Sequence, residues 1–197
     1  MTTLLDKKSL YVAVSYETAT YNDLKYFLEQ DGIELLRQDP DEFIGHHNPN
    51  ANYINLVTIV VEQRKTISRL LDDRNLARFS YIHKTSTNLG QIESGCFVYP
   101  SSIIYAGAVV KKDTIIHSMT VVAHNVTVGT GTYISAGVLI GGGTTLGQFN
   151  QYMLGVIIHD KITICDHVVI GSNTVIRKDI STPGTYSGKS NTVRKIK

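Results

Sequence analysis

The sequence predicts two successive folds: an α/β domain with a small, Rossmann-like parallel sheet over residues 1–82, and a parallel β-helix over residues 83–197. Two observations lead to this prediction. Up to about residue 80, segments with strand character alternate with segments of helical spacing, which is typical of a parallel sheet covered by helices. From residue 90 onward an aliphatic residue returns at every sixth position, and a hexapeptide repeat indicates a β-helix.

The composition limits the classes of partner. The net charge of +2 is too small to indicate nucleic acid or an anionic membrane surface as a partner. No run of 18 apolar residues could span a membrane, and the N-terminus lacks the features of a signal peptide. The two cysteines, Cys96 and Cys165, form neither a metal-ligand spacing nor a disulfide framework. We therefore expect reduced thiols, no metal site and a cytoplasmic protein.

The first domain is expected to contain three strands and two helices. Apolar spacing places Leu24, Phe27 and Leu28 on one face of the first helix. The strands are predicted at 9–15, 33–38 and 55–61, and the helices at 20–30 and 62–75. The segment 44–55 is expected to be a polar loop, in which His46 and His47 are solvated because no third metal ligand accompanies them.

The hexad repeat is long and unbroken. Stepping by six, fourteen of fifteen positions are Val, Ile or Leu: Ile92, Val98, Ile104, Val110, Ile116, Val122, Val128, Ile134, Ile140, Leu146, Tyr152, Ile158, Ile164, Ile170 and Ile176. The residue two places before each is mostly small or β-branched, so both should point inward from a short strand. Three hexads should close a triangular coil of 18 residues, which predicts about five stacked coils with a rise of roughly 4.8 Å each.

This pattern resembles the hexapeptide-repeat acyltransferases. The junction "IHKTS" (82–86) and the stretch "VVAHNVTVGTGTYISAGVLIGGG" are similar to the family of sialic-acid O-acetyltransferases and nucleotide-amino-sugar N-acetyltransferases. The resemblance implies that the β-helix is left-handed and that acetyl-CoA is the co-substrate. It further implies a homotrimer whose active sites lie between neighbouring prisms. The expected acceptor is an amino sugar, linked to a nucleotide, of the kind used in surface-glycan biosynthesis.

The resemblance also implies roles for single residues. His124 falls on the position of the general base, a role that suits an imidazole because it titrates near neutral pH. Gly142 lies 18 residues later, one coil above, and its free N–H is expected to bind the thioester carbonyl and the oxyanion. Tyr133 stands where relatives have a second histidine in contact with acetyl-CoA.

The chain departs from the family at two places. Asn125 replaces the acidic neighbour of the base, which favours an amine over a hydroxyl as the acceptor, because an amine needs less help from a base. The glycine-rich loop after the first strand is missing from "VAVSYETATYND" (12–23). Substrate contacts are expected from Ser15, Asp39, Asp41 and His117.

The end of the chain is basic. We expect Lys189, Arg194 and Lys195 to contact the phosphates of CoA, in a segment similar to the one that flanks CoA in the family. Three alternatives stay open: a sugar O-acetyltransferase, a non-catalytic β-helix scaffold, and a β-helix metal enzyme. The metal enzyme would use histidines such as His83 and His159, but no two neighbours among the candidates are separated by a multiple of 18 residues.

Overall fold

The computed structural model describes residues 5–197 except 17, 59 and 189–192. The chain forms two compact units, and the boundary between them lies after Tyr81. In the ranges described, no helix is both long and apolar enough to cross a membrane. The fold is an α/β unit with a small parallel sheet, followed by a left-handed parallel β-helix, as the repeat and the resemblance predicted.

The first unit is a three-stranded parallel sheet with helices. Its elements, in chain order, are β1 (Tyr11–Val14), α1 (Ala19–Gln30), β2 (Leu35–Gln38), α2 (Pro40–Gly45), β3 (Asn52–Asn55) and α3 (Val61–Asp73). The strand order is β2-β1-β3, and both pairs are parallel. Strands β1 and β2 and helices α1 and α3 lie within a few residues of their predicted positions.

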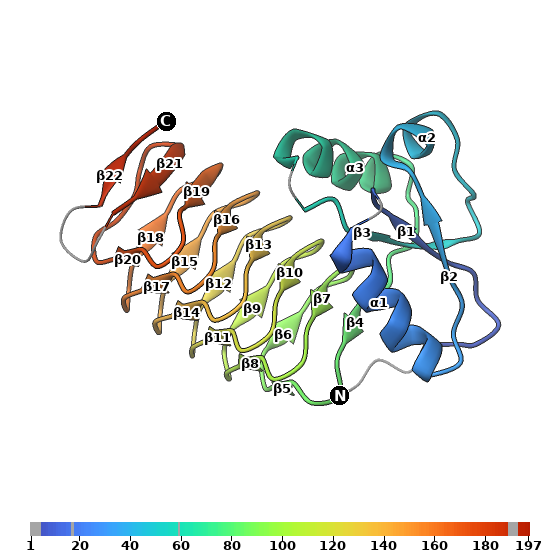
Figure 1. The fold of residues 1–197 in the computed structure, drawn as a ribbon, viewed down its shortest axis with the longest axis horizontal. Coiled ribbons are helices and arrows are strands. Elements are labelled where there is room, and N and C mark those ends of the chain that lie inside the picture. The colour runs from blue at the N-terminus through green and yellow to red at the C-terminus, as the bar shows by residue number, and fades with distance from the viewer. Residues whose placement is uncertain (1–4, 17, 59, 189–192) are drawn as a thin grey trace. The chain divides into compact units, whose positions relative to one another are not determined.

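Each face of the sheet is covered by helices. Val12, Val14 and Tyr53 pack in one cluster with residues of α2 and α3, and Figure 1 shows α1 on the other side of the sheet. The Thr18 hydroxyl accepts a hydrogen bond from the backbone N–H of Tyr21 and so caps the start of α1. Successive side chains of β1 point to opposite faces of the sheet, and all of them are apolar because both faces are covered.

Two predictions in this unit were wrong. The third strand was placed at 55–61, but β3 runs from Asn52 to Asn55. The Asn55 side chain accepts a hydrogen bond from the N–H of Val57 and donates one to the carbonyl of Arg64, so the chain turns immediately after the strand. Part of the predicted loop is helix α2, which begins with an Asp39 cap and Pro40, both ordinary helix-start signals.

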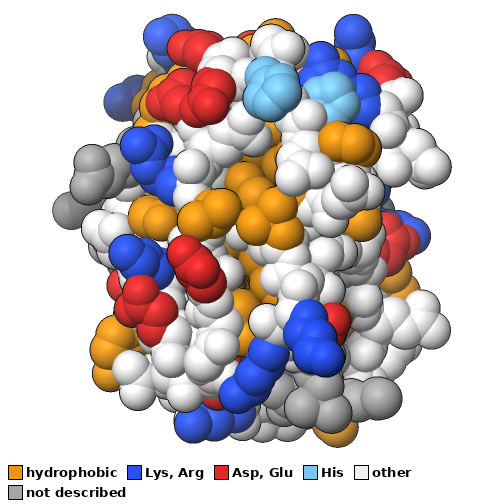
Figure 2. Space-filling model, turned by 90° about the vertical axis from the view of Figure 1, so that its right-hand side faces the viewer, with side chains coloured by type: hydrophobic (Ala, Val, Ile, Leu, Met, Phe, Trp, Pro, Cys, Tyr) orange, Lys and Arg blue, Asp and Glu red, His pale blue; other side chains and the backbone are white. Residues whose placement is uncertain are grey.

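The outer surface of the protein carries charges of both signs. Figure 2 shows a face on which hydrophobic side chains gather in the middle and basic and acidic side chains lie around them. Exposed large hydrophobic residues of the first unit include Leu36 on the edge strand β2 and Ile44 in α2. On the face in view, the described residues form no continuous basic surface of the kind that nucleic acid requires.

Three sheets form the prism of the β-helix, and all their strands pair in parallel except β22, which is antiparallel to β21. The eight-stranded face has the order β22-β21-β19-β16-β13-β10-β7-β4, the six-stranded face β20-β17-β14-β11-β8-β5, and the five-stranded face β18-β15-β12-β9-β6. The bounds on the eight-stranded face are β4 (Tyr81–Ile82), β7 (Phe97–Val98), β10 (Ile115–Ile116), β13 (Tyr133–Ile134), β16 (Gln151–Tyr152), β19 (Val168–Ile170), β21 (Gly184–Ser187) and β22 (Arg194–Lys195). Those on the six-stranded face are β5 (Thr87–Asn88), β8 (Ile103–Ile104), β11 (Val121–Val122), β14 (Leu139–Ile140), β17 (Ile157–Ile158) and β20 (Val175–Ile176). The five-stranded face contains β6 (Gln91–Ile92), β9 (Val109–Val110), β12 (Thr127–Val128), β15 (Thr145–Leu146) and β18 (Thr163–Ile164).

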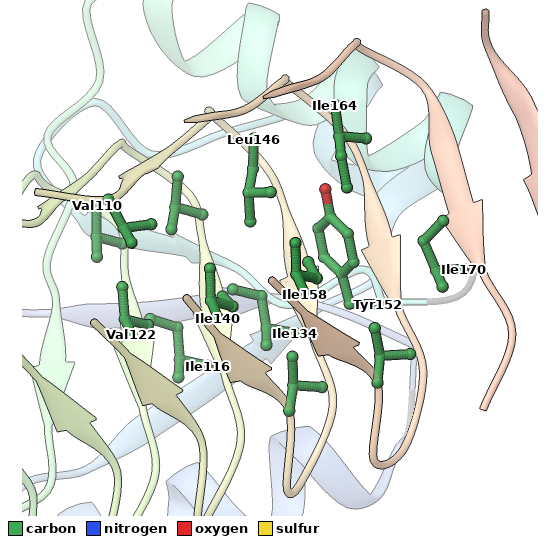
Figure 3. Packing of buried hydrophobic residues seen from close by; sticks show 14 of the residues in the cluster. Val110, Ile116, Val122, Ile134, Ile140, Leu146, Tyr152, Ile158, Ile164 and Ile170 are labelled. Atoms are coloured by element: carbon green, nitrogen blue, oxygen red, sulfur yellow. The ribbon is translucent and has the colours of Figure 1, made fainter. Parts of the chain in front are cut away.

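The hexad register is confirmed residue by residue. Val121 pairs with Leu139 and Leu139 with Ile157, so one coil takes 18 residues. Figure 3 shows Val110, Ile116, Val122 and the later hexad residues pointing into the prism side by side, and each of the three named is fully buried. Tyr152, the one exception to the aliphatic pattern, is also buried and receives a hydrogen bond from Asn150 Nδ2 at 3.0 Å. Burial raises the pKa of this phenol, so it stays neutral in the core.

The inward residues that precede the aliphatic ones link successive coils. Thr120 Oγ1 donates to the carbonyl of Ser135 at 3.1 Å, and the same bond recurs along the prism, always to the carbonyl 15 residues later. The other donors are Ser102, Thr114, Thr132, Thr144 and Asn150. These bonds explain why the six polar side chains are tolerated inside the prism, since each of them has a partner. Thr174, near the end of the prism, is the exception, because its buried hydroxyl has no partner among the described residues.

The β-helix has about six turns, one more than the repeat predicted. Strands β4 and β5, before residue 92, and β21, after the last hexad, make up the additional turn, and Asn88 occupies the inward position of β5. Thr87 pairs with Ile103, only 16 residues later, so the first coil is shorter than the others. A polar inward residue and a shorter coil both lie outside the hexad pattern, which is why the sequence did not reveal this turn.

Candidate active site

His124 lies on an exposed turn between the six-stranded and five-stranded faces. The turn follows β11 and precedes β12, and its backbone is fixed to the coils on both sides. The N–H of Ala123 donates to the carbonyl of Ile140 at 3.1 Å, and the carbonyl of His124 accepts from the N–H of Gly143 at 2.9 Å. The imidazole is therefore exposed to solvent on a rigid backbone, as a base for an external substrate must be.

Gly142 lies directly against the imidazole. A methyl group on its Cα would be 2.5 Å from both Cε1 and Nε2 of His124, so glycine leaves room for the ring in this position. The expected free N–H of Gly142 is not found: this N–H donates to Asp160 Oδ1 at 2.8 Å. Asp160 lies 18 residues after Gly142, so continuing the stacking rule by one more coil would have found it.

Asn125 occupies the position in each turn where the backbone enters the left-handed region. Its φ is 57°, and the N–H of Asn125 bonds to the carbonyl of Ala106 in the coil below. The side-chain Nδ2 lies 3.4 Å from His124 Nδ1, and Oδ1 lies over Gly107. If the Asn125 NH₂ group donates to Nδ1 of His124, the ring proton is on Nε2, and Nε2 cannot accept a proton. A base that acts through Nε2 needs its proton on Nδ1, and this requires the Asn125 Oδ1 to face the ring as the acceptor.

Two further candidates, His117 and Tyr133, lie together on the eight-stranded face. Their rings meet edge to face with centroids 5.1 Å apart, and His117 also stacks on Tyr99 at 4.1 Å. They are not on the turn that carries His124. Within one chain, His117 and Tyr133 therefore form a group separate from His124 and Gly142.

The basic candidates lie at the C-terminal end of the β-helix. Arg194 and Lys195 form β22, are exposed, and pair antiparallel with β21. A pocket of about 520 Å³ lies beside them, lined by Val175, Ile176, Arg177, Lys178, Asp179, Ile180, Tyr186 and Val193. Lys189 lies outside the described residues.

The candidates in the first unit serve local structure. Ser15 is fully buried, and its hydroxyl donates to the carbonyl of Tyr16 at 2.6 Å. Asp39 caps α2 by accepting the N–H of Asp41 at 3.0 Å. At the carboxyl edge of the sheet, Gln63 accepts a hydrogen bond from the Tyr16 hydroxyl and donates one to Asp41 Oδ1 at 3.0 Å. This link between α3, α2 and the segment after β1 could not be predicted from the sequence, because the pairing is set by tertiary structure.

The described residues give little support to a metal site or a cysteine nucleophile. No three His, Cys, Asp or Glu side chains among them lie close enough to hold a metal ion. Both cysteines are free thiols, and burial raises the pKa of Cys96 and, less strongly, that of Cys165. A thiol with a raised pKa is a poor nucleophile at neutral pH, so His124 is the better candidate for chemistry.

Solved structures share this fold over nearly the whole chain. The acetyltransferase domain of PglB from Neisseria gonorrhoeae superposes with a TM-score of 0.84 at 18% identity, over 94% of this chain and 99% of that one. A variant of perosamine N-acetyltransferase from Caulobacter crescentus, in complex with CoA and GDP-perosamine, gives 0.78 at 14% identity, over 93% and 96%. WeeI from Acinetobacter baumannii gives 0.55 at 12% identity, over 96% and 100%. A scan against protein-family models finds no match, and a search of curated proteins finds none.

Proposed function

We propose that the protein is an acetyl-CoA-dependent N-acetyltransferase that acts on a nucleotide-linked amino sugar. The observation that carries this proposal is the exposed imidazole of His124 packed against Gly142 on a rigid turn. The solved structures that share the fold support it, because one is in complex with acetyl coenzyme A and another with CoA and GDP-perosamine.

In this proposal His124 acts as the general base. The amine nitrogen of the sugar attacks the thioester carbon, the new C–N bond forms, and the C–S bond to CoA breaks. His124 takes the proton that the amine loses and returns it to the leaving thiolate or to solvent. Gly142 packs against the ring, and we assign its N–H as the donor to the oxygen that becomes negative during attack.

The edge of the prism that carries His124 leads to the basic end of the chain. Gly142 and Asp160 follow His124 in successive coils, and Lys178 holds the corresponding position in the coil after Asp160. Three rises of about 4.8 Å separate the coils of His124 and Lys178, roughly 14 Å in all. We place the phosphates of CoA near Arg177, Lys178, Arg194 and Lys195, beside the pocket of the last coil.

We also propose that three copies assemble through the six-stranded face. After Thr87 in β5, its outward side chains stack as an aliphatic ladder of Ile103, Val121, Leu139, Ile157 and Val175. Leu139 and Ile157 are 42% and 37% exposed, an apolar surface that single chains seldom leave in water. Because His124 lies at the edge of this face, a neighbouring copy could bring its Tyr133 to the site. The free thiols and the need for acetyl-CoA favour the cytoplasm.

The proposal is tested by incubating the protein with acetyl-CoA and a panel of nucleotide-linked amino sugars, with release of the CoA thiol as the readout. We expect turnover with at least one of them. His124→Ala should lower kcat by roughly 10²–10⁴-fold, the usual contribution of a general base. His159→Ala, which removes another exposed histidine, is the matched control and should change kcat little. Absence of turnover across the panel, or full activity of His124→Ala, contradicts the proposed function.

A further inference from the structure

Three consecutive backbone amides lie beside His124, and they differ in what they bind. The N–H of Gly141 donates to the carbonyl of Ile158 at 2.8 Å, and that of Gly143 to the carbonyl of His124 at 2.9 Å. Both bonds join neighbouring coils through the backbone. The N–H of Gly142 instead donates to the Asp160 carboxylate at 2.8 Å. Of these three amides, only that of Gly142 has a side chain as its acceptor.

A side-chain acceptor can leave without separating the coils. Asp160 is exposed, so its carboxylate can rotate about χ1 into water and be hydrated there. Release of the amides of Gly141 or Gly143 would require the coils to move apart. The Gly142 N–H is thus the donor at this edge that a ligand oxygen can reach by displacing one side chain.

The same arrangement recurs six residues later, where it lacks the base. The amides of Gly147 and Phe149 donate to the carbonyls of Ile164 and Thr130, each at 2.8 Å, and the amide of Gln148 donates to Asp166 Oδ1, also at 2.8 Å. Thr130 stands there in the place of His124. Asp166 therefore makes the same bond as Asp160 at a turn with no imidazole. Substitution of Asp166 controls for the loss of such a bond away from the proposed active site.

We propose that Asp160 is a positioning residue that occupies the Gly142 N–H in the free protein. The carbonyl oxygen of the acyl group that is to be transferred displaces Asp160 from this N–H. The inference rests on the proposed function, since the displacing ligand is the thioester carbonyl of acetyl-CoA. A carboxylate and a developing oxyanion carry the same charge and compete for one N–H, so both cannot occupy the site. Asp160 thus weakens binding of the acyl donor in its ground state.

The test compares binding of acetyl-CoA and of CoA to the wild type and to three variants by calorimetry. CoA has no acyl carbonyl, so the ratio of the two affinities isolates the contact at the Gly142 amide from general charge effects. Asp160→Ala should tighten acetyl-CoA binding relative to CoA by roughly threefold to tenfold, the scale of one hydrogen bond. Asp160→Asn keeps a neutral oxygen acceptor and should give a smaller change. Asp166→Ala should leave the ratio unchanged.

Turnover and thermal stability complete the experiment. Asp160→Ala should lower KM for acetyl-CoA without lowering kcat, and both alanine variants should lose similar thermal stability because each loses the same bond. Equal affinity ratios for Asp160→Ala and the wild type overturn the inference, even if the wild type acetylates an amino sugar. A tighter ratio without any turnover supports the inference and contradicts the proposed function. If no form binds acetyl-CoA, both are wrong.

Discussion

At the scale of single residues, the turns of the β-helix impose one backbone requirement. From Ile92 to Ile170, the third residue after each inward hexad position adopts a positive φ; examples are Gly107, Asp113, Asn125, Gly131 and Asn173. Glycine and asparagine accept this region at the least cost. Asn125 therefore meets a structural need that is independent of its neighbour, since Asn173 has the same conformation with no histidine before it.

Asn125→Asp tests what the side chain adds to this structural role. Aspartate also tolerates positive φ, and its carboxylate can only accept a hydrogen bond, so it fixes the ring proton on Nδ1 and frees Nε2. With an amine acceptor we expect kcat/KM to change by less than about tenfold, about 1.4 kcal/mol in barrier. The measurement is kcat/KM against pH for both proteins on the best amine and the best hydroxyl substrate.

A hydroxyl acceptor should respond more strongly to this variant, because removal of its proton is more demanding. A wild type that acetylates only hydroxyl groups would rule out the N-acetyltransferase assignment and leave Asn125 as a turn residue alone.

The sequence located some residues of the site and not others, for a physical reason. Stacking at a separation of 18 residues placed Gly142 above His124, because a β-helix converts sequence spacing into spatial neighbours. The bond from the Gly142 N–H to Asp160 depends on a side-chain rotamer, which spacing does not specify. The network of Tyr16, Gln63 and Asp41 joins three elements of a different unit, where no repeat relates one residue to another.

At the scale of elements, the strands of the β-helix were predictable and those of the α/β unit less so. The inward hexad residues all occupy the same kind of buried environment, so the same sequence pattern recurs along the chain and is easy to recognise. Strand β3 occurs once and consists of Asn, Tyr, Ile and Asn, which have no periodic signal of their own. Its place is fixed by the pairing of Tyr53 with Val12, and Tyr53 is fully buried. Tertiary contacts therefore outweighed local propensity.

Ile134→Asp tests the inward register of β13. Ile134 is fully buried in the prism, and a carboxylate there has no partner in the repeat, so burial should cost several kcal/mol. We expect insoluble or unfolded protein, or a large fall in the melting temperature. Thr145→Asp places the same charge at an exposed, outward position of β15 and should be close to neutral. Soluble Ile134→Asp protein with the wild-type melting temperature would contradict the register.

At the scale of the whole molecule, the faces of the prism differ in their suitability for assembly. From β8 onward the outward ladder of the six-stranded face is aliphatic, whereas the five-stranded face presents Gln91, Val109, Thr127, Thr145 and Thr163. Threonine rows can remain hydrated, while a row of Leu and Ile is stabilised when another surface covers it. Of these two faces, the six-stranded face is therefore the better candidate for the interface.

Leu139→Glu should therefore disrupt assembly. A charge in the middle of the aliphatic ladder would have to be desolvated in the interface, so light scattering should show single chains in place of a trimer. Activity should fall with assembly if a neighbouring copy completes the site. Thr145→Glu, on the five-stranded face, should leave the mass of the assembly unchanged. A trimer that persists in Leu139→Glu places the interface elsewhere.

The asparagines that lie over glycines constrain how this chain can evolve. Asn125 covers Gly107, and Asn173 covers Gly155 in the same way. A methyl group on either glycine would collide with the amide oxygen above it, so neither partner can change freely on its own. We therefore expect such residues, one coil apart, to change together. In homologous chains, substitutions should covary at a separation of 18 residues more strongly than between adjacent positions.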